Sequence, residues 1–156
     1  MVILFSKIMA ALICMHIDDW ALGLMGEDYR ADLQQIVDQA VEQGNPIYNL
    51  HSNKWPAHML CDRPDIMQIA YKDYISYDEQ LVAAKRRLVD DGVTAAEACG
   101  WSIDFCIKHM IALMENHSEN PAVIFTDAAS LGWSEELYRR VLETIIPTKP
   151  IPGLCR

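Results

Sequence analysis

The chain has 156 residues, a formal net charge of −9 and a hydrophobic content of 51%. This length fits one domain with a sizeable core, and the hydrophobic content argues against disorder. The negative charge and the absence of clustered Lys and Arg argue against a nucleic-acid partner and an anionic membrane surface. We therefore expect a single domain over residues 1–156, with residues 147–156 as an extended, proline-rich tail.

The first twenty residues are mostly apolar but fit neither a secretion signal nor a membrane span. Lys7 interrupts the apolar run, and Asp18 and Asp19 end it. A signal carries its positive charge ahead of the apolar region, and a membrane helix needs about 20 mostly apolar residues. We interpret residues 7–17 as a buried first strand, with a helix as the alternative.

Strand and helix patterns alternate along the rest of the chain. Apolar residues at helical spacing, Gly after the helix ends and Ser76 as a possible N-cap indicate helices. The predicted helices are residues 26–44, 76–92, 103–117 and 134–146. The predicted further strands are residues 45–51, 65–71, 93–99 and 121–129, and residues 52–65 are expected to form a loop.

This alternation predicts right-handed βαβ units and an α/β fold. We expect three αβα layers with a mostly parallel, doubly wound central sheet. In such sheets ligands bind beyond the carboxyl ends of the strands. The residues that follow the predicted strands are therefore the candidates for a site: Asp18, Asp19, His51, Lys72, residues 100–106 and Asp127.

An acidic residue, Lys72 and Cys106 would meet at this edge, and their chemistry is coherent. A lysine ammonium and a helix N-terminus both stabilise a thiolate. A carboxylate can take the thiol proton as general base and pass it to a leaving amine. Backbone N–H groups in the turn before Cys106 can hold an oxyanion. The alternative is that Cys106 is a small buried side chain of the core.

Residues 99–106, CGWSIDFC, resemble the signature of the isochorismatase-like cysteine hydrolases. In that family a strand runs into Gly-x-x-x-Asp-x-Cys at the start of a helix, and Gly100, Asp104 and Cys106 stand at these positions. Lys72 and Asp127 lie where the family has a lysine and a strand-end aspartate. The resemblance covers most of residues 8–146 in order and spacing.

The resemblance implies a small cysteine hydrolase that cleaves an amide or related C–N bond through a Cys106 thioester. Family members with this cysteine act on compounds such as nicotinamide or N-carbamoyl compounds, whereas members that act on isochorismate lack it. The implied catalytic residues are Cys106, Lys72 and Asp18, with Trp101, Ser102 and Cys106 in the oxyanion turn. The family also places a non-proline cis peptide just before its oxyanion hole, which here would be the Trp101–Ser102 bond. No cofactor is implied.

The position of the acidic residue is ambiguous. An ungapped match of the first strand puts His16 where the family has its aspartate, and a shift of two residues puts Asp18 there. We favour Asp18 because it ends the apolar run; a neutral imidazole can also serve as base. His16, the bulky Trp101 and the short chain leave an alternative, a catalytically inactive isochorismatase-like binding or assembly protein.

The candidate substrate pocket consists of His16, Asp19, His51 and Trp101. Nicotinamidase-like members bind a divalent metal through Asp-x-His and a second His, but Asn49 stands where that carboxylate belongs. We expect no metal, with His51 and His58 as the only weak candidates. A flavodoxin-like nucleotide binder is disfavoured because no Gly-rich phosphate loop follows the first strand.

The five cysteines, at an odd count and with no CxxC pair, indicate a reduced cytoplasmic location. They also make structural zinc unexpected, because ligand pairs at the usual spacing are missing. We expect a small-molecule substrate, no nucleic acid, no membrane and a homo-oligomer.

Overall fold

The computed structural model describes residues 10–72, 75–101, 103–116, 122–125, 132–134, 136–137, 139–140 and 143. Its elements in chain order are β1 (Ala10–Met15), α1 (Asp19–Met25), α2 (Glu27–Glu42), β2 (Ile47–Ser52), α3 (His58–Cys61), β3 (Met67–Tyr71), α4 (Tyr77–Asp90), β4 (Ala95–Trp101), the π-helical turn η1 (Ile103–Ile107), α5 (Lys108–Asn116), β5 (Ile124–Phe125) and β6 (Gly132–Trp133). Ser102, Asp127 and the tail 147–156 lie outside the described residues.

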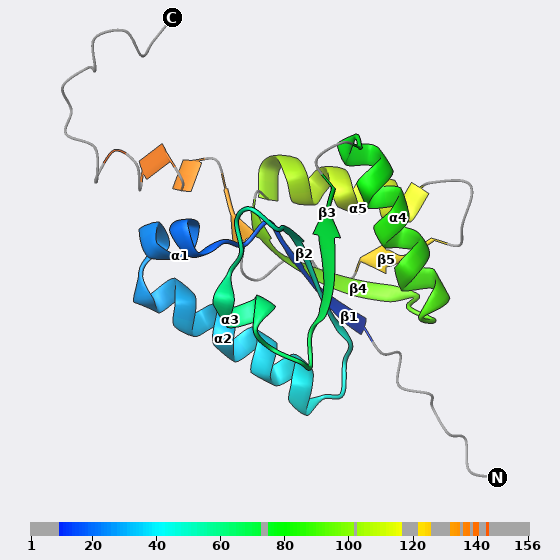
Figure 1. The fold of residues 1–156 in the computed structure, drawn as a ribbon, viewed down its shortest axis with the longest axis horizontal. Coiled ribbons are helices and arrows are strands. Elements are labelled where there is room, and N and C mark those ends of the chain that lie inside the picture. The colour runs from blue at the N-terminus through cyan, green and yellow to red at the C-terminus, as the bar shows by residue number, and fades with distance from the viewer. Residues whose placement is uncertain are drawn as a thin grey trace, which may run out of the picture.

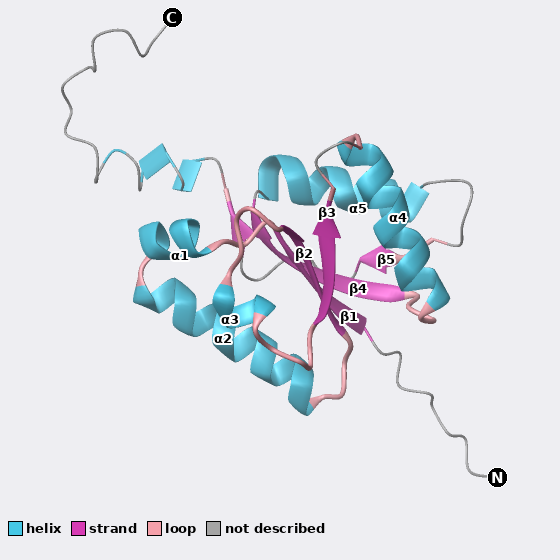
Figure 2. Cartoon of the chain, viewed as in Figure 1, coloured by secondary structure: helices cyan, strands magenta, loops and turns pink. Residues whose placement is uncertain are grey.

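The strands form a parallel sheet with helices on both of its faces (Figures 1 and 2). The strand order is β3-β2-β1-β4-β5, and β6 also pairs with β4. The chain therefore has the predicted three-layer αβα fold with a doubly wound central sheet. No helix among the described residues is long and apolar enough to cross a bilayer.

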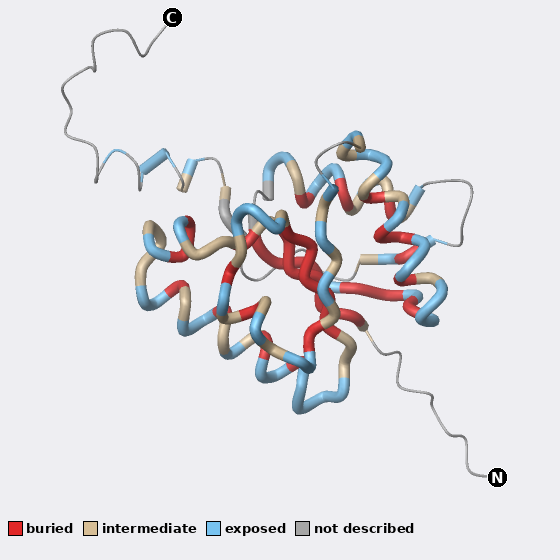
Figure 3. The backbone as a smooth tube through the Cα atoms, viewed as in Figure 1, coloured by how far each residue is buried: buried red, intermediate tan, exposed pale blue. Residues whose placement is uncertain are grey.

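Alternate side chains of β1 build two separate cores. Ile13 and Met15 pack with α4 and α5, whereas Leu12 and Cys14 pack with α1, α2 and α3. This division follows from the period of two in a strand, which sends successive side chains to opposite faces. Because β1 lies at the centre of the sheet, both of its faces are buried (Figure 3).

The predicted helix boundaries are confirmed at two ends. Ser76 caps α4, and its capping box with Glu79 is complete. Gly44, with a φ of +70°, follows the end of α2. Such a conformation is open to glycine at no steric cost, which explains the sharp stop.

Two short helices add to the predicted elements. The helix α1 forms because the Asp18 side chain accepts a hydrogen bond of 2.8 Å from the Ala21 N–H, and it ends at Gly26 with a φ of +87°. The second, α3, is a single turn at His58–Cys61. The expectation of a loop over residues 52–65 was wrong at α3, where the buried Leu60 is enough to hold a single helical turn.

Gly100 allows the carboxyl end of β4 to approach β1 closely. Its φ is +118°, and a Cβ atom built there would lie 2.1 Å from the Met15 carbonyl oxygen. The Ala residues of β4 are weak strand formers, but the central position of the strand overrides that propensity. The glycine of the sequence signature thus has a steric role next to the candidate site.

Candidate active site at the carboxyl edge of the sheet

Three parallel strands end at the same edge and deliver side chains to one region. His16 follows β1, Tyr71 ends β3, and Cys106 lies in η1 shortly after β4. Cys106 is half-buried, and it packs with Tyr71 against the core on the α4–α5 face. A π-helical turn is rare and recurs at functional sites, which makes the location of the thiol notable.

Tyr77, the first residue of α4, links these groups. Its hydroxyl donates to the Cys106 carbonyl oxygen at 3.4 Å and contacts the Met15 sulfur at 3.8 Å. Its ring centroid lies 5.7 Å from that of His16 and 6.1 Å from that of Tyr71. We refer to this group as the Cys106 cluster, and its members are His16, Tyr71, Tyr77, Cys106 and His109, whose ring stacks on Tyr77.

The half-buried His16, Tyr71 and Tyr77 of the Cys106 cluster are uncharged at neutral pH. Burial lowers the pKa of His16 to about 4, so its imidazole is neutral and can accept a proton. Burial, followed by the nearby Cys106, raises the pKa of the Tyr77 hydroxyl. Burial likewise raises the pKa of Tyr71, whose hydroxyl has no hydrogen-bond partner among the described residues. A neutral imidazole and an unpaired phenol thus both belong to the cluster that contains Cys106.

His16 also has an unusual backbone conformation. Its φ of +52° is the only positive value at a non-glycine residue in the described part of the chain. Its N–H donates to the Leu50 carbonyl oxygen at 3.0 Å, which anchors the turn to β2. Left-handed non-glycine residues are uncommon and cluster at functional sites. The turn directs the imidazole toward Tyr71, at a ring distance of 5.1 Å.

Asp18 lies in different surroundings. Its carboxylate caps α1, and it lines a pocket of about 400 Å³ together with Trp20 and Trp55. We call this the tryptophan pocket. Among the residues that the structure describes, no hydrogen bond, ion pair or ring contact joins Asp18 to the Cys106 cluster. His16, the alternative for the acidic position, instead contacts Tyr71 and Tyr77 within the Cys106 cluster.

The histidines considered for metal binding have separate roles. His58 is exposed and pairs through Nδ1 with the Asp19 carboxylate, which raises the pKa of His58. His51 is buried, and its Nε2 has no hydrogen-bond partner within the described residues. Asn49 donates to Gln68 at 2.9 Å. Within the described ranges, no three His, Cys, Asp or Glu side chains gather as metal ligands.

Lys72 and the turn after β4 complete the set of predicted residues. Lys72 directly follows β3 and is exposed, and its carbonyl oxygen accepts from Gln80 at 3.3 Å. Trp101 ends β4, and its backbone pairs in register with Trp133 of β6. Lys72 and Trp101 thus lie at the same edge of the sheet as Cys106.

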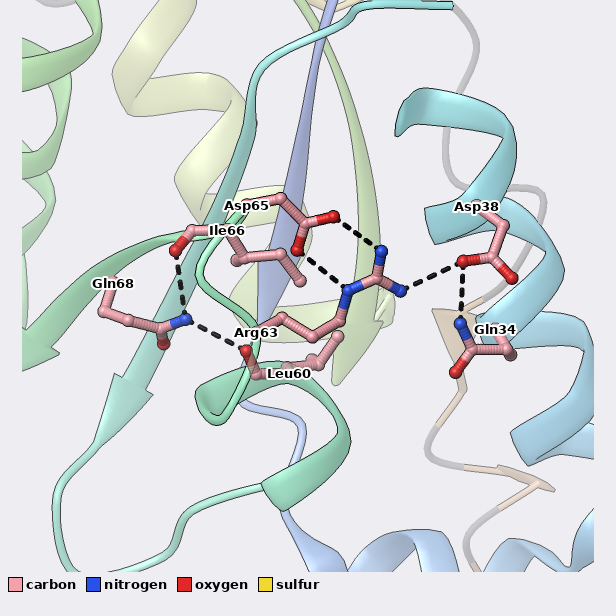
Figure 4. Close-up of polar contacts among 7 residues, drawn as sticks. All are labelled: Gln34, Asp38, Leu60, Arg63, Asp65, Ile66 and Gln68. Atoms are coloured by element: carbon pink, nitrogen blue, oxygen red, sulfur yellow. Dashed lines mark hydrogen bonds and ion pairs between the residues drawn. The ribbon is translucent and has the colours of Figure 1, made fainter. Parts of the chain in front are cut away.

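Arg63 anchors the segment between α3 and β3 to α2 (Figure 4). Its guanidinium forms two bonds with Asp65, at 2.9 and 2.7 Å, and one with Asp38 at 3.0 Å. The hydrogen bonds that Arg63 donates to Asp65 and then to Asp38 raise the pKa of Arg63. Gln68 closes the same segment by donating to the Leu60 carbonyl oxygen at 3.0 Å.

The sequence interpretation missed Tyr71 and Tyr77. The available signal was their position: Tyr71 is the last residue of a predicted strand and Tyr77 the first residue after a predicted N-cap. Comparison of the chain with protein-family models, with curated proteins and with solved structures gives no match. The resemblance to isochorismatase-like hydrolases accordingly rests on the residues of the chain itself.

Proposed function

We propose that this protein is a small cysteine hydrolase that cleaves an amide or related C–N bond, with Cys106 as nucleophile and His16 as general base. One observation carries the proposal: Tyr77 contacts both the backbone of Cys106 and the ring of His16 at the carboxyl edge of the sheet. The neutral imidazole is in the protonation state that a base requires.

The reaction would follow the usual course of covalent thiol catalysis. The Cys106 sulfur attacks the substrate carbonyl carbon while His16 takes the thiol proton. His16 then gives that proton to the nitrogen of the leaving amine, the C–N bond breaks, and a thioester remains. Water then attacks the thioester carbonyl while His16 takes one proton from it; the C–S bond breaks, the carboxylic acid product leaves, and His16 gives that proton to the Cys106 sulfur.

The other predicted residues keep supporting roles in this proposal. Lys72 supplies positive charge at the edge, and the turn of Trp101, Ser102 and Cys106 supplies oxyanion donors, as the resemblance implies. His51, Trp101 and the unpaired Tyr71 hydroxyl orient a small-molecule substrate. A cytoplasmic location and a homo-oligomeric state belong to the same proposal.

Site-resolved alkylation with iodoacetamide tests the nucleophile. At pH 7 we expect Cys106 to react at least about tenfold faster than glutathione, because a positioned base assists thiol attack. His16→Asn should remove that advantage. His109→Asn is the matched control, since His109 also stacks on Tyr77 but is exposed and pairs with Asp78. The buried thiols of Cys14 and Cys99, 3.6 Å apart, should stay unlabelled in the native protein.

The same experiment separates the enzyme from an inactive relative. If Cys106 reacts no faster than glutathione, and a panel of small amides yields no amine product, the chain is a binding or assembly protein with this fold. If His16→Asn keeps the fast reaction while Asp18→Asn loses it, the base is Asp18 and the assignment of His16 is wrong.

A further inference from the structure

We propose that the tryptophan pocket, lined by Asp18, Trp20 and Trp55, binds the ammonium group of a small organic cation. Its volume of about 400 Å³ lies within the range of small-molecule sites. Trp20 is 58% exposed and Trp55 is 65% exposed. Both indole side chains are thus more than half exposed where they line the pocket. A cation that carries apolar methyl groups can cover this surface.

The chemistry of the lining selects a cation. The face of an indole ring attracts positive charge, and ammonium groups are its best ligands. One carboxylate oxygen of Asp18 caps α1, and the other has no hydrogen bond within the described residues. The chain as a whole has a net charge of −9, which favours the approach of cations.

The two walls of the tryptophan pocket are tied together before any ligand binds. The Asp19 N–H donates to the Pro56 carbonyl oxygen at 3.1 Å, and the His58 N–H donates to the Asp19 carboxylate at 3.2 Å. Trp20 and Trp55 are the chain neighbours of Asp19 and Pro56, so these bonds fix the backbone beneath both rings. Preorganisation of this kind reduces the entropic cost of binding.

These bonds also identify the carboxylate that meets the ligand. Both oxygens of Asp19 contact His58, one through the backbone N–H and the other through the ring. Asp18 lines the pocket, and one of its oxygens has no hydrogen bond to any residue in the described part of the chain. The inference needs no reaction at Cys106, because α1 covers the face of the sheet opposite to α4 and α5.

Choline and its uncharged isostere 3,3-dimethyl-1-butanol provide a direct test with the full chain. Binding is followed by the NMR signals of the Trp20 and Trp55 indole N–H groups. We expect choline to bind saturably and at least about tenfold more tightly than the isostere. Trp55→Leu and Asp18→Asn should each weaken choline binding by about tenfold, the second while keeping the N-cap.

Two controls make the result decisive. Asp28→Asn removes an exposed carboxylate from the first turn of α2, and it should leave choline binding unchanged. Cys106→Ala should also leave it unchanged, so that failure of the proposed hydrolase leaves this site standing. Equal binding of choline and the isostere would overturn the proposal, as would equal weakening by Asp28→Asn and Asp18→Asn. Absence of saturable shifts in the Trp20 and Trp55 signals would overturn it too.

Discussion

The Cys106 cluster and the tryptophan pocket lie at the same edge of one sheet but in opposite environments. In the cluster, burial keeps His16 and Tyr77 neutral around a thiol. In the pocket, two indole rings stay exposed beside the carboxylate of Asp18. The first arrangement suits proton transfer, which needs groups with shifted pKa values, and the second suits recognition of a charged ligand.

The separation begins within three residues of β1. His16 adopts a left-handed conformation, Ile17 is buried in the core with α1 and α2, and Asp18 starts α1. Two side chains that are neighbours in sequence thus reach different faces of the sheet. A local turn, and not the identity of the residues alone, decides which of them contacts Tyr71 and Tyr77.

Replacement of Gly100 by Ala should have the largest effect, because it disturbs the contact between β4 and β1. The new Cβ atom would lie 2.1 Å from the Met15 carbonyl oxygen, and the φ of +118° is strained for Ala. We expect a loss of roughly 3 kcal/mol or more in the free energy of unfolding. Urea denaturation followed by circular dichroism measures it.

Gly23→Ala is the control for this change. Gly23 lies inside α1, and nothing stands within 4 Å of its added Cβ atom. Ala has the higher helix propensity, so this variant should gain up to about 1 kcal/mol. Equal stability of the two variants would contradict a steric role for Gly100.

Removal of the His16 imidazole should change how stability depends on pH. The pKa of His16 is about 4 in the folded protein and 6.5 ordinarily, so the unfolded state binds the extra proton between these values. The contribution of His16 is complete above pH 6.5 and is lost as the pH falls toward 4. Its full size is about 3 kcal/mol at most.

His16→Asn tests this without a change of backbone, because Asn tolerates the left-handed conformation. Between pH 7.5 and pH 5 the variant should lose less unfolding free energy than the wild-type protein. The acidic groups common to both proteins cancel in that difference. Parallel pH curves for the two proteins would show that His16 is not buried as a neutral base.

The sequence was sufficient to predict the layers of the fold but not which of the candidate site residues lie together. Helical spacing and the Ser76 cap report local preferences, and the structure confirms α2, α4 and the parallel sheet. The different surroundings of His16 and Asp18 depend instead on a left-handed turn at one residue, which the hydrophobic periodicity of the sequence does not reveal. Tyr71 and Tyr77 were missed because the sequence alone does not distinguish a tyrosine of the hydrophobic core from one at a site. The contact between their rings is known only from the structure.

The smallest predicted effect concerns Arg63, which ties the segment between α3 and β3 to α2. Arg63→Met keeps the aliphatic stem but removes the bonds to Asp65 and Asp38. We expect a loss of about 1 kcal/mol in the free energy of unfolding, less at high salt, since such partly exposed pairs are weak. Arg87→Met is the matched control, because among the described residues Arg87 forms its ion pair with Asp91, at the end of its own helix. This variant should lose less unfolding free energy than Arg63→Met.

The location of the change then sharpens the comparison of the two regions. Arg63 fixes the segment that follows α3 by binding Asp38 of α2. The first residue of α3, His58, donates to the carboxylate of Asp19, which is the chain neighbour of Trp20 in the tryptophan pocket. Arg63→Met should therefore shift the indole signal of Trp55 and leave the alkylation rate of Cys106 unchanged. A slower reaction at Cys106 would mean that the two faces of the sheet are coupled, and that the cluster and the pocket form one site.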